Sequence, residues 1–187
     1  MKKVLCGIGI LLVVGIALGG YKFVVGRKMS ADTDDIDGGV VHDYQDPNAP
    51  KTIESDEIVK FYCDFSLLTH VETENLGNRV YKLTAILEDE VVKCCIDWHA
   101  GGEGEKTEFN AEPVFMKKLH EIVEKYDFAQ HNGMVYTVSG LPDHFGSKLD
   151  IEYSSGENIY AYDNQSVFIS MDAMKELVEL FRNGALN

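Results

Sequence analysis

Residues able to bind metal or act as nucleophiles are concentrated in one short stretch of the sequence, VVKCCIDWHAGGEGEK at positions 91–106. If this stretch is an extended strand, its side chains alternate between two faces, so that Cys95, Asp97 and His99 share one of them. Thiolate, carboxylate and imidazole groups are all zinc ligands. One hypothesis is therefore a zinc site formed by these three residues.

A second interpretation treats the same stretch as an ordinary strand. Cys94, Ile96 and Trp98 would then face the core, and the three potential ligands would occupy a wetter face without a chemical role. The paired ligand spacing that marks a strong zinc signature is absent. The zinc hypothesis also needs a fourth ligand, for which the candidates are His70, His120 and an acidic residue of the glycine loop.

Three cysteines follow the first 28 residues: Cys63, Cys94 and Cys95. On the strand interpretation, Cys63 and Cys94 both point inward, where they could form a disulfide across neighbouring strands and leave Cys95 free. They could equally remain buried thiols that act as small apolar residues. A thiol-redox module that uses all three cysteines is a further hypothesis.

Catalysis has little support in the sequence. A nucleophile–base pair at Cys95 and His99 would leave the two residues about 13 Å apart along one strand, too far for a hydrogen bond between them. The chain has no G-x-S-x-G, no H-E-x-x-H and no phosphate-binding glycine loop. We therefore predict that the protein is not an enzyme, with no catalytic residue and no cofactor other than the zinc considered above.

A second group of residues could form a binding surface. His144 and Phe145 lie in the stretch SGLPDHFGSKLD, where glycines and a proline predict a turn. Tyr160 and Tyr162 are two residues apart, so they share one face of a strand and could bind a peptide or a glycan. The alternatives are that Phe145 folds back into the core and that the tyrosines are half-buried sheet residues.

The first 28 residues differ in composition from the rest of the chain. They contain five basic residues and no acidic residue, and an apolar run extends from Val4 to Gly20 and on to Val25. As a helix, this run is long enough for the roughly 30 Å apolar core of a bilayer. We predict a transmembrane anchor or uncleaved signal over residues 1–28, with a cleaved signal peptide as the alternative.

The rest of the chain is strongly acidic. From Met29 onward it contains 12 basic and 31 acidic residues, a net charge of −19. Because this charge repels phosphate backbones, we predict no nucleic-acid partner. The acidic residues after Lys28 favour a single-pass protein of the cell membrane whose C-terminal domain is extracytoplasmic.

Residues 29–53 are acidic, contain Pro47 and Pro50 and show no sustained periodicity, which predicts a flexible linker. Residues 54–187 are predicted to form a single α+β domain. Apolar residues that alternate with polar ones, bounded by turn residues, predict six strands. These strands cover residues 57–68, 79–88, 90–98, 134–140, 148–154 and 158–164.

Two amphipathic helices complete the predicted domain. The first starts after Asn110 and closes at residues 132–133, and the second covers Met171 to Arg182 with Ser170 as its N-cap. The order β-β-β-α-β-β-β-α has too few helices for parallel crossovers, so we predict a mainly antiparallel sheet with two packed helices. Matching residues in the two helices, 55 positions apart, suggest a duplicated unit.

The runs LHEIVEKYDFAQHNG (residues 119–133) and FGSKLDIEYSSGENIYAYDN (residues 145–164), followed by the closing helix, resemble domains of uncharacterised membrane- or lipid-anchored extracytoplasmic proteins of Gram-positive bacteria. The resemblance implies an α+β build and an extracytoplasmic location, and it implies no activity. Together with the residues above, it predicts a membrane-tethered, non-catalytic binding or accessory domain. Its partners would be the membrane and an unknown protein or cell-surface ligand.

Overall fold

The structure, a computed structural model, describes residues 39–68, 76–77, 79–140 and 145–186. No helix among these residues is long and apolar enough to cross a membrane, and the anchor predicted over residues 1–28 lies outside them. The described residues from Val40 onward belong to one compact unit. The domain therefore begins earlier than the predicted residue 54.

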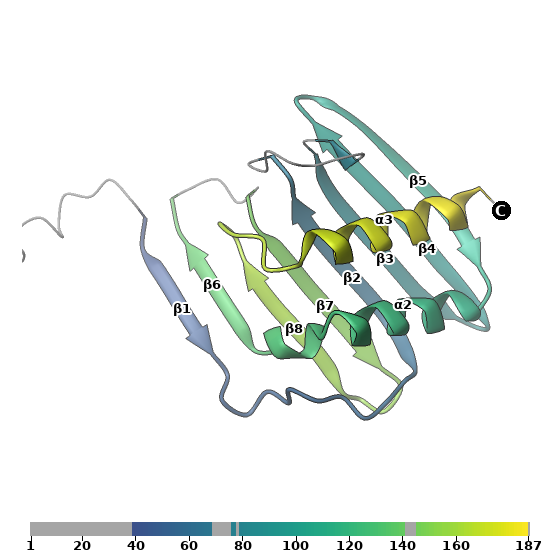
Figure 1. The fold of residues 1–187 in the computed structure, drawn as a ribbon, viewed down its shortest axis with the longest axis horizontal. Helices are drawn as coiled ribbons and strands as arrows, with labels where there is room; N and C mark the ends of the chain where they lie inside the picture. The colour runs from purple at the N-terminus through teal and green to yellow at the C-terminus, as the bar shows by residue number, and fades with distance from the viewer. Residues whose placement is uncertain (1–38, 69–75, 78, 141–144, 187) are drawn as a thin grey trace, which may run out of the picture. The chain divides into compact units, whose positions relative to one another are not determined.

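The unit is built on one eight-stranded sheet with the order β1-β6-β8-β7-β2-β3-β4-β5 (Figure 1). All neighbouring strands are antiparallel except β6 and β8, which are parallel. This confirms the α+β class and the mainly antiparallel sheet. The strands are β1 (Val41–Gln45), β2 (Ile58–Ser66), β3 (Val80–Glu88), β4 (Val91–Ala100), β5 (Glu103–Ala111), β6 (Met134–Val138), β7 (Ser147–Tyr153) and β8 (Asn158–Asp163).

The predicted order of elements is wrong at β1 and β5. β1 lies in the segment predicted as a flexible linker, and β5 lies in the segment predicted as a glycine loop and helix start. Both are edge strands of the sheet. All five residues of β1 are exposed, and β5 is exposed at six of its nine positions. Because an edge strand buries few side chains, neither segment shows the apolar alternation by which the central strands are predicted.

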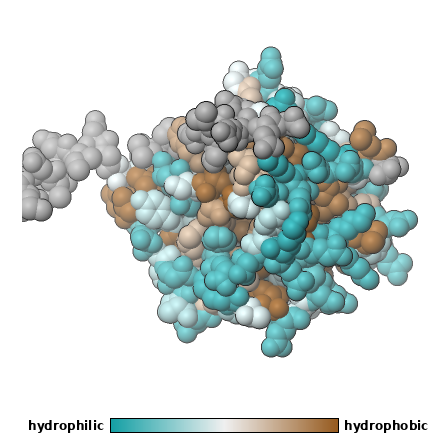
Figure 2. Space-filling model, in the orientation of Figure 1, coloured by the Kyte–Doolittle hydropathy of each residue, from teal (hydrophilic) through white to brown (hydrophobic). Residues whose placement is uncertain are grey.

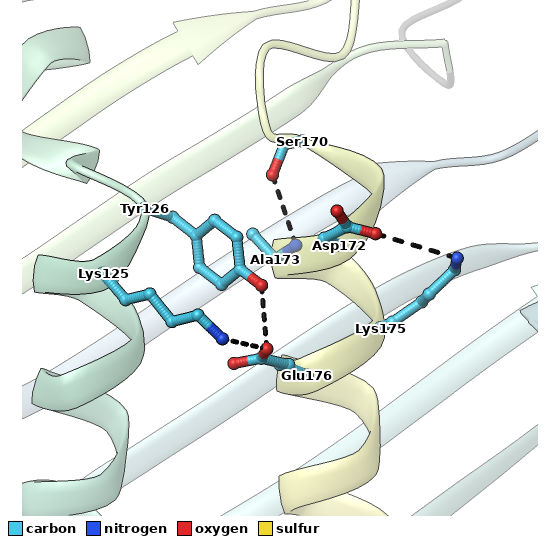
Figure 3. A network of polar contacts seen from close by, with 7 residues as sticks. All are labelled: Lys125, Tyr126, Ser170, Asp172, Ala173, Lys175 and Glu176. Atoms are coloured by element: carbon cyan, nitrogen blue, oxygen red, sulfur yellow. Dashed lines mark hydrogen bonds and ion pairs between the residues drawn. The ribbon is translucent and has the colours of Figure 1, made fainter.

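Two helices cover the same face of the sheet, α2 (Val114–Lys125) and α3 (Met171–Ala185) (Figure 1). A short 3-10 helix, η2 (Phe128–His131), follows α2. The prediction that Ser170 caps α3 is confirmed, because its hydroxyl accepts a hydrogen bond from the Ala173 amide (3.2 Å). The helices are also joined to each other through Glu176, whose carboxylate accepts hydrogen bonds from Lys125 and from the Tyr126 hydroxyl (Figure 3).

The core fills the space between these helices and the sheet. Alternate residues of each central strand point toward the helices, as Phe61, Cys63 and Phe65 do on β2, and all three are fully buried. Four aromatic rings, one each from β2, β5, α2 and α3, pack together in the core with centroids 5.1–6.3 Å apart. These rings belong to Phe61, Phe109, Phe115 and Phe181.

The strand topology does not repeat between the two halves of the domain. The strands before α2 include β2 to β5, which are neighbours in sequence order. Before α3, by contrast, β7 pairs with β8 and β2, while β6 pairs in parallel with β8. The similarity of the two helices therefore reflects their common amphipathic pattern, and the topology gives no support to a duplicated unit.

Candidate binding face

The sheet has a second face, opposite α2 and α3, which we call the open face. No described helix or strand covers it. Its side chains come from the alternate positions of each strand, such as Lys60, Tyr62 and Asp64 on β2. From β8 to β4 the side chains of this face are mostly half-buried, because they pack against one another. Near β5 the side chains of the face are exposed.

One row across the open face alternates in charge. Register places five charged residues side by side on neighbouring strands. In order across β7, β2, β3, β4 and β5, they are Lys148, Asp64, Lys82, Asp97 and Lys106. Opposite charges directly across neighbouring strands stabilise a sheet by roughly 0.2–1 kcal/mol per pair.

A second row carries tyrosines beside this charged row. Tyr160, Asp150 and Tyr62 are neighbours on β8, β7 and β2. The Lys148 ammonium lies 5.4 Å from the ring centroid of Tyr62 and 5.5 Å from that of Tyr160. Both distances fall within the range of a cation–π interaction. Lys148 therefore links the charged row to the tyrosines.

Burial shifts the titration of the groups in this region. The Tyr62 hydroxyl donates a 2.7 Å hydrogen bond to Asp64, and burial followed by this contact raises the pKa of Tyr62. Burial also raises the pKa of Asp64, although the hydroxyl of Tyr62 and the ammonium groups of Lys148 and Lys82 act in the opposite direction. Ionising Tyr62 or Asp64 in the folded protein therefore costs more free energy than ionising the same group in water.

The open face balances its charges, in contrast to the rest of the chain. A third row contains Lys60, which forms ion pairs with Asp150 (3.1 Å) and Glu152 (2.6 Å). Together the three rows hold five lysines and five acidic residues, whereas the chain carries a net charge of −14. The helix side of the molecule is largely hydrophilic (Figure 2). The open face thus carries lysines at regular positions on neighbouring strands, each with acidic residues beside it.

The structure places Cys95, Asp97 and His99 together on the open face of β4. Cys94 and Ile96 are buried on the helix side and Trp98 is half-buried there, so the predicted alternation is confirmed. Among the described residues no group of three or more histidines, cysteines and acidic residues could hold a metal ion. At this position the register places Asp97 between Lys82 and Lys106, two cationic residues that disfavour a metal ion beside it.

Of the histidines proposed as fourth zinc ligand, the structure places only His120. His120 lies on α2, on the opposite side of the sheet from Cys95. His70 lies outside the described residues. The Cys95 thiol is half-buried, and burial raises its pKa.

A disulfide between Cys63 and Cys94 is contradicted by the strand order. Cys63 lies on β2 and Cys94 on β4, with β3 between them. Two strand spacings amount to about 9.6 Å, whereas bonded cysteines have Cα atoms no more than about 7 Å apart. All three described cysteines are free. Burial raises the pKa of Cys63, and it raises that of Cys94 to about 12.

Of the other predicted binding residues, the structure places the two tyrosines on the open face. Tyr160 and Tyr162 share the open face, as their alternation predicts, and Tyr162 is the neighbour of Lys148 in the charged row. Phe145 is half-buried before β7, and His144 lies outside the described residues. Sequence analysis missed Tyr62 and Lys148, although their positions opposite the apolar residues of predicted strands were a usable signal.

Comparison of the chain with models of protein families, with curated proteins and with solved structures finds no match.

Proposed function

We propose that this protein is a membrane-tethered, extracytoplasmic binding module without catalytic activity, and that its open face contacts a protein or cell-surface ligand. One observation carries the proposal. The sheet buries one face under two helices and leaves the other uncovered by any described element, with tyrosines and both charge signs in fixed register.

Two physical arguments support this surface over the others. Tyrosine is enriched among residues that dominate binding energy, because it contributes a large rigid area and a polar tip. Charges held in register discriminate between partners, since a wrongly aligned partner meets like charges. A partner for this face would itself carry both signs, because neither sign predominates in the three rows.

Site-specific photo-crosslinking in the native cells tests the proposal. A photoreactive amino acid replaces Thr84, which lies at the centre of the open face, or Lys118, which is exposed on the outer side of α2. We expect a defined crosslinked product from position 84 that weakens in Lys82→Glu. Equal crosslinking from position 118, or none from position 84, would contradict the proposal.

A further inference from the structure

A pocket of about 260 Å³ lies on the helix side of the molecule, away from the open face. It is bordered by the C-terminal half of α2, by η2, and by the segment around Lys51 and Ile53. Tyr153 at the end of β7 and Ile159 of β8 complete its wall. The open-face proposal uses none of these residues.

The wall of this pocket contains one buried polar atom that has no hydrogen-bond partner among the described residues, Nδ1 of His120. Tyr153 is only 3% exposed, and its hydroxyl makes no hydrogen bond with any described residue. The His120 ring lies edge-on to the Tyr153 ring, with centroids 6.3 Å apart, and its buried Nδ1 also has no partner among the described residues. Because buried polar atoms in native proteins are almost always satisfied, the unpaired Nδ1 of His120 indicates that the pocket holds an occupant.

The charges around the pocket favour a cationic occupant. Glu124 and Asp127 contribute two carboxylates, against one ammonium from Lys51. The Glu124 carboxylate also lies 3.5 Å from Nε2 of His120. That ammonium is already bound by two backbone carbonyls, those of Gln130 (3.1 Å) and Asn132 (2.5 Å). Burial, followed by the charges of Glu124 and Glu157, raises the pKa of Tyr153 to about 12, so its hydroxyl stays neutral.

The remaining wall is apolar. Ile53, Val123 and Ile159 line it, and Val123 and Ile159 are buried. An occupant with a short hydrocarbon stem would cover these side chains while its polar end reached the hydroxyl and the carboxylates. The volume is slightly below the range of ordinary ligand pockets, which limits the occupant to a small group.

We propose that this pocket binds a primary alkylammonium group, carried either by a small free amine or by a lysine side chain of a partner. An ammonium has three donors and no acceptor, which matches a wall that offers carboxylates and a hydroxyl oxygen. Tyr153 accepts one hydrogen bond, Glu124 and Asp127 supply the compensating charge, and Val123 with Ile53 contacts the alkyl stem.

The test uses the full chain in a neutral detergent, with isotope-labelled tyrosine observed by NMR. The Tyr153 signal is assigned from its loss in Tyr153→Phe. Three probes of one shape and different charge are titrated: n-butylammonium, n-butanol and butyrate. We expect saturable shifts of the Tyr153 signal with n-butylammonium, affinity for n-butanol lower by on the order of tenfold, and no effect of butyrate.

Variants locate the interaction. Glu124→Gln should weaken n-butylammonium binding several-fold, whereas Glu121→Gln, on the exposed side of the same helix and outside the pocket, should leave it unchanged. Tyr153→Phe, followed through a Val123 methyl signal, should also weaken binding. It should leave the thermal midpoint nearly unchanged, because the hydroxyl bonds nothing in the described protein.

The proposal is overturned if n-butanol or butyrate binds as well as n-butylammonium, or if no probe shifts the Tyr153 signal, since the pocket would then hold only water. A fourth probe, Nα-acetyl-lysine N-methylamide, distinguishes the two sources of the ammonium. Tighter binding than n-butylammonium indicates a lysine side chain, and weaker binding indicates a free amine.

Discussion

The hydroxyl of Tyr62 donates a 2.7 Å hydrogen bond to the carboxylate of Asp64, two residues farther along the same face of β2. The contact holds a tyrosine and a charge together at the centre of the open face, between Lys148 and Lys82. It also gives the face a measurable response to pH.

The pKa of Asp64 is raised in the folded protein, mainly by burial. A raised carboxyl pKa contributes stability at pH values below the unfolded pKa, and this contribution is lost as pH rises through the folded pKa. We expect Asp64→Asn to gain stability relative to the wild type as the pH rises above about 4, the ordinary pKa of an aspartate. Urea unfolding at several pH values measures this, and a constant difference between the two proteins would contradict it.

Gly184 lies inside α3 against the aromatic cluster. A Cβ atom at this position would come within 2.7 Å of the Phe109 ring and 3.0 Å of the Phe115 ring. Replacing a helical glycine by alanine ordinarily stabilises a helix by about 1 kcal/mol. Here we expect Gly184→Ala to destabilise the protein by about 1–3 kcal/mol, because the rings must shift. Glu179→Ala, on the exposed side of α3, is the control for helix propensity in the same unfolding experiment.

Asn132 is a buried junction between three segments of the chain. Its side-chain amide donates to the carbonyls of Pro50 (3.0 Å) and Asn158 (2.9 Å), and its oxygen accepts from the Tyr160 amide (2.9 Å). We expect Asn132→Ala to cost at least about 2 kcal/mol, because it leaves three backbone groups without partners. Asn158→Ala, an exposed site, should change the free energy of unfolding little; equal losses for both variants would argue against the junction.

The three described cysteines should differ in reactivity. Cys63 and Cys94 are buried, and burial raises the pKa of both thiols. Cys95 is only half-buried, and the positive charge of Lys106 partly offsets the rise in its pKa. We expect iodoacetamide at pH 8 to modify Cys95 first in the native protein, as measured by peptide mass spectrometry. Rapid modification of Cys94 would mean that β4 opens readily.

Metal binding is measured on the same preparation. Native mass spectrometry, performed without chelator, should show no zinc that depends on the open face of β4, because Lys82 and Lys106 flank Asp97. A bound zinc mass that disappears in His99→Ala would instead restore the zinc hypothesis.

The extracytoplasmic location is tested with a thiol at an exposed turn. Ser155 lies in the turn between β7 and β8 and is exposed. We expect Ser155→Cys to react with a membrane-impermeant maleimide in intact cells as fast as in lysed cells. Labelling only after lysis would place the domain in the cytoplasm.

Local sequence patterns were sufficient to predict the central strands, the two helices, the Ser170 cap and the two faces of β4. Each of these features follows from residues close together in the sequence, because side chains repeat with a period of two residues along a strand and 3.6 residues along a helix. Cys95, Asp97 and His99 could be assigned to one face for that reason, before any contact was known.

Which segments become neighbours is set by the fold and could not be predicted from local patterns. Strand order places β3 between Cys63 and Cys94 and brings Lys148 beside Tyr62. The edge strands β1 and β5 escape prediction because pairing with one neighbour requires little apolar burial. The pocket at His120 and Tyr153 joins residues from α2 and β7. Their meeting is fixed by long-range packing, which no local pattern in the sequence encodes.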